Sequence, residues 1–388
     1  MIAAVVVKMA PRAPAPALNV TPAGLAGDVL VEDDGALGEV LFQYTAAQEE
    51  LVAPTYIDFL RALDPATQLV AVVPCDPDAG TSDAAALRAF LARVDPAGGL
   101  ARRTRIVETT GPITVWSKDR ALVLAAPRTQ LVVPMRPDPA WRERFNDWAT
   151  LASVAKAMPE RFLVNEVPLD YDAGDFAVTG DKIIVDVNLV AKNQKHGLTT
   201  PRALSEHLAR TFHRTIVMLG DAEGDVPRHH LSMYMTPLAD GSMLVGDPRA
   251  ARDLVGPAFT PGEESPDTGE PLVADFSDAT LARFDRAAKD LAAAGFRVER
   301  VPVVPFDDKT YITYTNGVYE RRGTRKIAYV PQYSRDPADR AVSRMDALAV
   351  ATYQRLGWEV RAVRVRDAYR FHGTIGCLCN VLRRDRTP

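Results

Sequence analysis

The sequence contains few cysteines and no apolar run long enough to cross a membrane. Only three cysteines occur among its 388 residues, which is too few for the disulfide framework of a small secreted protein. A membrane-spanning helix needs roughly 20 consecutive apolar residues, and no stretch approaches that length. The net charge of −4 at pH 7 favours neither nucleic acid nor a membrane surface as a partner. These absences predict a globular cytoplasmic protein.

The N-terminal segment differs in composition from the rest of the chain. Residues 1–37 are rich in proline and alanine, and their apolar start ends at Lys8, which is too short for the core of an export signal. A truncated export signal is an alternative interpretation. We expect residues 1–37 to form a linker and a first extended stretch, and residues 38–388 to form a single domain.

Several widespread catalytic signatures are also missing. The phosphate-binding patterns G-x-G-x-x-G and G-x-x-x-x-G-K-[ST] are absent, as are the serine-hydrolase pattern G-x-S-x-G and the zinc-protease pattern H-E-x-x-H. A zinc site made by Cys377, Cys379 and His372 is an alternative, but the C-x-C spacing suits one tetrahedral ion poorly. No metal site is therefore expected.

What the sequence does contain is a recurring order of strands and helices. Apolar, β-branched segments alternate with longer segments that repeat apolar residues at helical spacing. Strands are predicted at 38–44, 68–75, 113–126, 129–135 and 358–365. Hairpins are predicted at 175–187, 230–247 and 311–333, the first two with turns at Gly180-Asp181 and Asp240-Gly241. Helices are predicted at 82–95, 140–158, 201–213, 276–295 and 336–357.

The ends of two helices and the spacing of the units add to this pattern. Ser82 and Ser277 are expected to cap helix N-termini, and Gly295 is expected to end the second of these helices. The strand–strand–helix–strand order recurs about five times, at intervals of very roughly 55 to 80 residues. Repetition at this spacing favours a ring or solenoid of repeats over one doubly wound sheet.

Polar residues stand beside the predicted strands of successive repeats. WSKD contains Asp119, YDAGDF contains Asp172 and Asp175, RHHLS contains His230, and GTIGCLCN contains Cys377. Each has an ordinary structural explanation, because aspartates cap turns, and both cysteines of GTIGCLCN could pack on one side of a final strand. A ring of repeats would instead bring these carboxylates, the histidine and the thiol together around one axis.

These patches resemble those of the guanidino-group-modifying enzymes of the pentein fold. That group contains arginine and agmatine deiminases, bacterial peptidylarginine deiminase, dimethylarginine dimethylaminohydrolase and the arginine:glycine amidinotransferases. The resemblance extends from about Gly38 to Arg384 and rests on five short patches. It implies an α/β fold, a five-bladed propeller of ββαβ repeats around a central polar site.

Three patches imply the acidic and basic residues of such a site. VWSKD is similar to the W-x-R-D patch of agmatine deiminases, which implies that Asp119 contacts a guanidinium, although RAL replaces the usual G-P after it. YDAGDF resembles the F-D-A-A-D-F patch of amidinotransferases and the E-G-G patch of deiminases, which implies a catalytic role for Asp172 beside Asp175. HLSM is similar to H-x-D, which implies that His230 is the general acid/base, with Ser232 in place of the aspartate.

The last two patches imply the nucleophile and one neighbour. YTNGVY and YVPQY resemble a deiminase hairpin whose asparagine borders the site, here Asn316. GTIGCLCN is similar to G-x-x-H-C-x-T-N, which implies that Cys377 is the nucleophile and that Cys379 stands in the place of a threonine. The histidine that usually precedes the cysteine is Gly376 in this chain.

The resemblance implies a cysteine-dependent hydrolase of the deiminase type, acting on arginine or an arginine derivative through a covalent amidino-thiol intermediate. Neither a cofactor nor a metal is expected, the expected partner is a small guanidino substrate, and a homodimer is left open. An amidinotransferase is one alternative, because of YDAGDF. A non-catalytic pentein that serves as a binding scaffold is another, because of Ser232 and Gly376.

Overall fold

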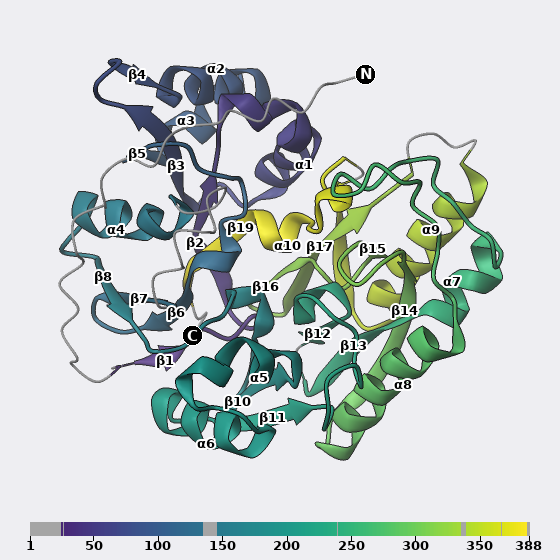
Figure 1. The fold of residues 1–388 in the computed structure, drawn as a ribbon. Coiled ribbons are helices and arrows are strands. Elements are labelled where there is room, and N and C mark those ends of the chain that lie inside the picture. The colour runs from purple at the N-terminus through teal and green to yellow at the C-terminus, as the bar shows by residue number, and fades with distance from the viewer. Residues whose placement is uncertain are drawn as a thin grey trace.

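In the part of the chain that the structure describes, five small β-sheets surround a common centre, and the longer helices lie on the outside (Figure 1). The computed structural model describes residues 25, 27–134, 146–238, 240–334, 339–365 and 367–385. The short helix α10 (Ile375–Leu378) lies near the centre of the ring. The chain is therefore an α/β propeller of five blades, and the predicted fold class is confirmed.

Every blade contains one unit in which the second strand is antiparallel to the first and parallel to the third. A parallel pair needs a long crossover, and helices provide it in each unit. One blade consists of β6 (Leu122–Ala125), β7 (Thr129–Val133), α4 (Asp147–Ala157) and β8 (Phe162–Glu166), with β1 (Asp28–Val29) paired to β6. The next consists of β9 (Ala177–Thr179), β10 (Lys182–Asp186), α5 (Asn188–Asn193), η4 (Gln194–His196), α6 (Pro201–Phe212) and β11 (Thr215–Leu219).

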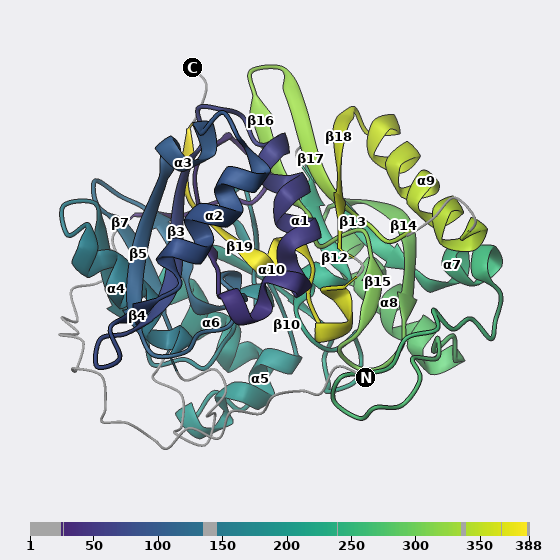
Figure 2. The same cartoon turned by 90° about the horizontal axis from the view of Figure 1, so that it is seen from above.

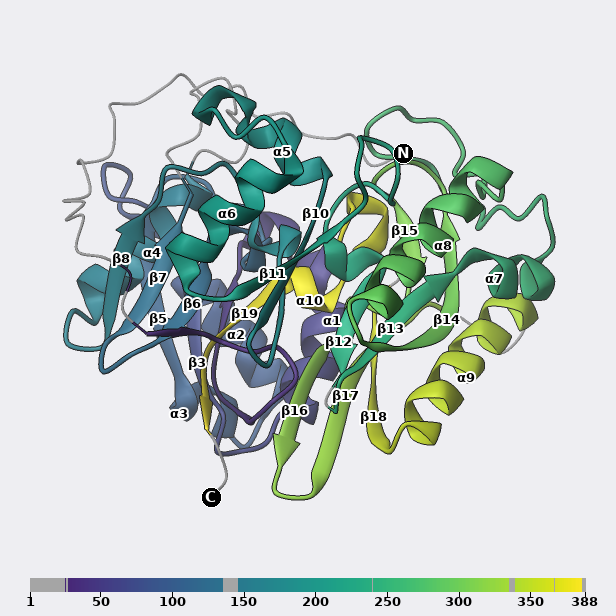
Figure 3. The ribbon, with the colours of Figure 1, turned by 90° about the horizontal axis from the view of Figure 1, so that it is seen from below.

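The third and fourth blades repeat the same order. The third consists of β12 (Met235–Leu238), β13 (Ser242–Asp247), α7 (Pro248–Val255), α8 (Asp278–Ala293), β14 (Arg297–Pro305) and β15 (Tyr311–Thr313). The fourth consists of β16 (Val318–Arg322), β17 (Arg325–Gln332), α9 (Arg340–Arg355) and β18 (Trp358–Arg364). The hairpin of β16 and β17 projects beyond its neighbours in the views from above and from below (Figures 2 and 3).

The fifth blade combines the two ends of the chain. Its unit consists of β19 (Cys379–Asp385), β2 (Ala36–Gln43), η1 (Ala46–Gln48), α1 (Glu49–Ala62) and β3 (Gln68–Asp76). Two further strands pair with β3, namely β4 (Thr81–Ser82) and β5 (Thr104–Thr110). The helices α2 (Ala84–Val94) and α3 (Gly99–Arg103) connect these two strands. The proposed boundary after residue 37 stays a prediction, because residues 1–24 and 26 lie outside the described chain.

The hydrophobic core lies on both sides of the blades. Along β3, Leu69, Ala71 and Val73 pack in one cluster with α1 and α2, whereas Val70 and Val72 pack in another cluster with α4. Successive strand residues face opposite sides, so a strand that is covered on both faces is apolar at every position. Among the described residues, no helix is both long and apolar enough to span a membrane.

Several local predictions are confirmed. The turn residues Asp240 and Gly241 both have positive φ, at 72° and 71°, which is typical of a type I′ turn between two strands. The Ser277 hydroxyl accepts a hydrogen bond from the Thr280 N–H at 3.3 Å and caps α8, and Gly295, with φ of 91°, follows its end.

Other local predictions are wrong. The strand predicted from residue 113 begins only at Leu122, because the Thr114 N–H donates to the Asp147 carboxylate at 2.7 Å rather than to a strand. Asp83 is the N-cap residue of α2, while Ser82 Oγ accepts from the Ala84 N–H at 3.1 Å.

The third predicted hairpin is shorter than expected, and α1 and several shorter helices were not predicted. β15 pairs with β14 of the preceding blade, so only β16 and β17 form that hairpin. The helix α1 was missed because Pro54 lies inside it, and proline disfavours helix interiors. Two predicted helices begin at residues that lie outside the described chain, 140–145 and 336–338, and their described parts are α4 and α9.

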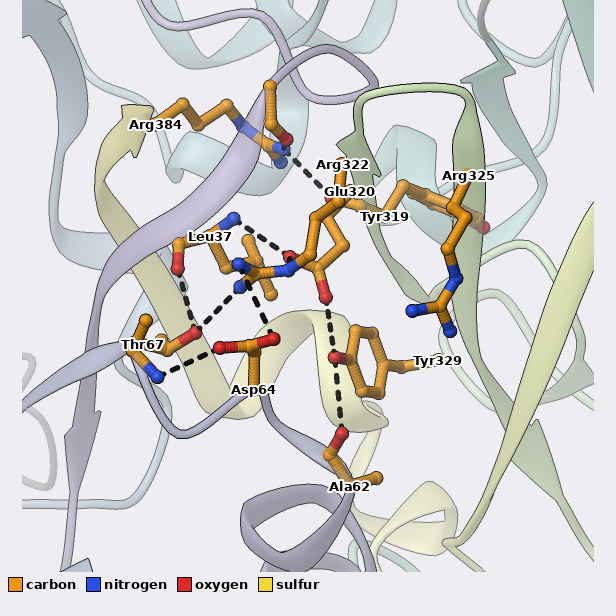
Figure 4. Close-up of polar contacts among 12 residues, drawn as sticks. Leu37, Ala62, Asp64, Thr67, Tyr319, Glu320, Arg322, Arg325, Tyr329 and Arg384 are labelled. Atoms are coloured by element: carbon orange, nitrogen blue, oxygen red, sulfur yellow. Dashed lines mark hydrogen bonds and ion pairs between the residues drawn. The ribbon is translucent and has the colours of Figure 1, made fainter. Parts of the chain in front are cut away.

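A buried polar cluster ties β2 to the hairpin of β16 and β17 (Figure 4). The fully buried Glu320 carboxylate accepts hydrogen bonds from Leu37 N at 3.0 Å, Arg322 Nε at 2.9 Å and the Tyr329 hydroxyl at 2.7 Å. Arg322 extends the cluster to the Thr67 hydroxyl at 3.1 Å. Because a buried carboxylate needs such donors, the cluster fixes the fourth blade against the fifth.

We expect the Glu320→Ala variant to lose about 3–5 kcal/mol in the free energy of unfolding, because three donors lose their buried acceptor. Urea denaturation measures this loss. Glu359 is the control, because its carboxylate is 42% exposed and pairs with Arg325 and Arg361 at the surface. Glu359→Ala should cost less than about 1 kcal/mol, and equal losses in the two variants would contradict the role of the cluster.

Candidate active site

Five segments meet at the centre of the ring, and each precedes the first strand of a blade. η2 (Lys118–Arg120) precedes β6, η3 (Ala173–Asp175) precedes β9, η5 (Leu231–Met233) precedes β12, and α10 precedes β19. Asn316 has the corresponding position before β16. η2 contacts η3 and α10, and η3 contacts η5. The repeat therefore places polar residues from all five blades beside one another.

Cys377 lies in α10 and is 3% exposed. Its Sγ accepts a hydrogen bond from Asn316 Nδ2 at 3.0 Å. The backbone carbonyl of Asn316 accepts two more hydrogen bonds from this segment, from Thr374 Oγ1 at 2.7 Å and from Gly376 N at 3.2 Å. Asn316 thus holds both the thiol and the backbone that carries it.

Two glycines beside Cys377 leave no room for a side chain. A Cβ atom at Gly376 would lie 1.9 Å from Asn316 Oδ1. A Cβ atom at Gly373 would lie 2.4 Å from the Trp116 ring and 3.0 Å from the Cys377 Cβ. The departure from the deiminase pattern at Gly376 is therefore coupled to the position of the Asn316 amide.

His230 lies between two carboxylates and is 4% exposed. Its Nδ1 is 3.7 Å from Asp119 Oδ1, and its Nε2 is 3.7 Å from Asp172 Oδ2. Burial disfavours the charged imidazole, but Asp119, Asp172 and the nearby Cys377 together raise the pKa of His230 well above its usual value. A Cβ atom at Gly174 would lie 2.5 Å from the imidazole, so this glycine makes room for the ring.

A second histidine stacks on the first. The rings of His229 and His230 have centroids 4.1 Å apart and planes 17° apart. His229 Nε2 lies 2.8 Å from the His372 carbonyl oxygen and can donate to it. Burial and the charge of His230 lower the pKa of His229 well below its usual value. A neutral imidazole therefore covers one face of the charged one.

Asp172 and Asp175 hold each other and one lysine. The Asp172 N–H donates to Asp175 Oδ2 at 2.9 Å, and this contact is part of a capping box around η3. Lys192 Nζ donates to Asp175 Oδ2 at 2.6 Å and to Asp172 Oδ2 at 3.2 Å. Burial alone would raise the pKa of Asp172, but Lys192, His230 and Arg120 lower it well below its usual value.

Arg120 and Lys192 belong to the site although the sequence analysis did not select them. Arg120 Nη2 donates to Asp172 Oδ1 at 3.0 Å and lies 3.9 Å from Asp119 Oδ2. The signal for Arg120 was the replacement of the usual G-P after Asp119. Nothing local marked Lys192, which lies at the end of the short helix α5.

Ser232 and Cys379 lie beside a cavity that Cys377, His230 and Asp172 do not line. Residues 29–32, Asn316 and Gly376 also border it. Ser232 contributes its backbone carbonyl as acceptor for Thr315 Oγ1 at 2.8 Å. The Cys379 thiol donates to the Ile375 carbonyl at 3.4 Å, and burial raises its pKa to about 12. Ser232 therefore lines this cavity, and its contact with a substrate stays a prediction.

The interpretation that both cysteines lie on one face of a final strand is wrong, because Cys377 lies in α10 and only Cys379 begins β19. In the described chain, these cysteines and His372 do not form a metal-type cluster. Asp119, Asp172 and His230 do offer ligand atoms within 4.8 Å of one another. Both Asp172 oxygens already contact protein cations, so we assign this cluster to those cations.

Comparison with known proteins gives matches in structure only. No protein-family model and no curated protein sequence matches the chain. The agmatine deiminase of C. jejuni is 13% identical, with a TM-score of 0.62 over 96% of this chain and 99% of that one. A variant of that enzyme with substrate bound is 14% identical, with a TM-score of 0.63 over 92% and 97%.

The agmatine deiminase of Enterococcus faecalis is 11% identical, with a TM-score of 0.58 over 94% of this chain and 99% of that one. At these identities the similarity concerns the fold, and a fold by itself carries no reaction. The five-sheet ring agrees with these matches along nearly the whole chain. The chain has the five-bladed α/β propeller of the agmatine deiminases, the pentein fold.

Proposed function

We propose that the chain is a cysteine-dependent hydrolase of guanidino groups, of the deiminase type, acting on arginine or an arginine derivative. The position of Cys377 carries the proposal. Its thiol lies at the centre of the ring, against the Asn316 amide and near a His230 imidazole that is flanked by two carboxylates. A thiol nucleophile needs such a neighbouring acid/base, and a guanidinium needs such carboxylates.

In the first half of the proposed reaction, Asp119 and Asp172 bind the substrate guanidinium, with Asp175 supporting Asp172. The Cys377 thiolate attacks the central carbon and forms a C–S bond. His230, which its raised pKa keeps protonated at neutral pH, gives its proton to the departing nitrogen as the C–N bond breaks. An amidino-thiol intermediate remains, and ammonia or an amine leaves.

In the second half, the neutral His230 accepts a proton from water while the water oxygen attacks the amidino carbon. The C–S bond breaks, and the ureido product and the Cys377 thiolate are released. If an amine attacks in place of water, the amidino group is transferred, and YDAGDF is the patch that favours this alternative. A binding scaffold without catalysis is the third hypothesis, since Ser232 and Gly376 depart from the deiminase pattern.

A screen over guanidino compounds tests the proposal. Free arginine, agmatine, methylated arginines and peptidyl arginine are incubated with the protein, with and without amine acceptors, and ureido product and ammonia are measured. We expect turnover of at least one compound, and a loss of at least about 1,000-fold in Cys377→Ala. Cys379→Ala should retain activity. No turnover of any compound, or equal turnover in Cys377→Ala, would exclude the mechanism.

The pKa of His230 predicts a pH-dependent contribution to stability. This pKa is raised in the folded chain, so protonated His230 stabilises the fold fully below its unfolded pKa of about 6.5. The contribution is lost as the pH rises through the raised folded-state pKa. The difference in unfolding free energy between wild type and His230→Gln should therefore be larger at about pH 6 than at about pH 9.

Urea denaturation at several pH values measures this difference. His207 is the control, because burial lowers its pKa. The difference in unfolding free energy between wild type and His207→Gln should therefore not decrease as the pH rises. A difference for His230→Gln that stays constant or grows with pH would contradict the assignment of a raised pKa.

Gly174→Ala should lower the rate of turnover, because the new Cβ would displace the His230 ring from its place between the carboxylates. We expect a decrease of about 100-fold, the size typical of a displaced general acid/base. Gly180→Ala is the control, because Gly180 has a positive φ of 55° but no atom near its Cβ position. That variant should lose stability and keep its turnover. Equal turnover in wild type and Gly174→Ala would contradict the proposed role of the His230 position.

A further inference from the structure

Arg120 places a guanidinium of the protein on the carboxylates that the proposed reaction needs for its substrate. Its Nη2 donates to Asp172 Oδ1 at 3.0 Å and lies 3.9 Å from Asp119 Oδ2. The Arg120 side chain is only 5% exposed. This internal group has the same chemistry and the same charge as the reacting group of a guanidino compound.

Asp172 already contacts cations through both of its carboxylate oxygens. Oδ1 accepts from Arg120, and Oδ2 accepts from Lys192 Nζ at 3.2 Å and lies 3.7 Å from His230 Nε2. A guanidinium that binds a carboxylate through two parallel hydrogen bonds uses both oxygens. A second guanidinium therefore cannot take this contact while Arg120 stays in place.

The two carboxylates anchor the head group of Arg120. Its Nε is buried and has no hydrogen-bond partner among the described residues. A buried guanidinium with an unpartnered Nε–H depends on its ion pairs. Arg120 is the last residue of η2, directly after Asp119, and the residue that follows it is extended. The backbone therefore attaches the Arg120 side chain next to the Asp119 carboxylate.

We propose that Arg120 determines the specificity of this site by occupying the guanidinium subsite formed by Asp119 and Asp172, so that a substrate binds there only by displacing it. The inference rests on the proposed function. Simple guanidinium compounds then bind weakly, and a good substrate needs further contacts with the rest of its structure. Removal of Arg120 opens the subsite to the free guanidinium ion.

Thermal unfolding of the full chain, with and without low millimolar guanidinium chloride, tests this opening. Sodium chloride at equal concentration is the salt control. A ligand that binds only the folded state raises the Tm. We expect the guanidinium ion to raise the Tm of Arg120→Ala and to leave that of the wild type unchanged. No increase in Arg120→Ala, or an equal increase in the wild type, would overturn the inference.

Arg322→Ala is the matched control, because it also removes a guanidinium from a buried carboxylate, that of Glu320 (Figure 4). The guanidinium ion should stabilise Arg120→Ala more than Arg322→Ala. Equal stabilisation would show a general response of buried carboxylates, and that outcome would also overturn the inference.

Alkylation of Cys377 gives a second readout, and Arg120→Lys serves here if Arg120→Ala does not fold. Chloroacetamidine is a cation, and chloroacetamide is its neutral counterpart. In both, Sγ forms a C–S bond with the methylene carbon as the C–Cl bond breaks and chloride leaves. The ratio of the amidine rate to the amide rate should rise by about tenfold or more in the Arg120 variant.

Lys192→Met separates occupancy from charge, because it removes one positive charge from the Asp172 carboxylate without removing a guanidinium. Its rate ratio should rise less than that of the Arg120 variant, and equal ratios would overturn the inference. The guanidino screen is independent of these measurements. Absence of turnover would remove the proposed function, whereas the Tm comparison would still show whether Arg120 fills a guanidinium subsite.

Discussion

The antiparallel pairing of β19 with β2 is the constraint on which the rest of the structure depends. β19 ends the described chain, β2 is its first long strand, and Cys379 pairs with Phe42 in their register. The pairing closes the ring, since without it two sheet edges would lack partners. It also fixes α10, which directly precedes β19, and so places Cys377 at the centre. The position of the proposed nucleophile is thus a consequence of ring closure.

The charged groups at the centre stabilise one another because they are buried together. A buried ion is costly unless an opposite charge and hydrogen bonds compensate it. Against the effect of burial, Lys192, His230 and Arg120 lower the pKa of Asp172, while Asp119 and Asp172 raise the pKa of His230. The contacts that keep these groups charged also connect η2, η3 and η5. The chemistry of the site and the packing of three blades therefore depend on the same ion pairs.

Local rules predicted most of the repeat and failed where distant contacts decide. The turn at Asp240-Gly241 and the Ser277 cap depend on residues only a few positions apart, so their sequence signals were reliable. The helix α1 forms despite Pro54, since Val52 and Tyr56 on its inner face are fully buried. No short-range pattern contains the packing that compensates for a proline. The loop before β6 likewise depends on a distant contact, because the Thr114 N–H donates to the carboxylate of Asp147 in α4.

By itself, the sequence determined the approximate number and the order of the repeats, because these follow from spacing and local propensity. It also identified Asp119, Asp172, His230 and Cys377 as candidates through their resemblance to known patches. Only the tertiary structure decided that Arg120 lies on the same carboxylates. That contact joins residues 52 positions apart in different blades, and no periodicity within a segment specifies which side chains meet where blades converge.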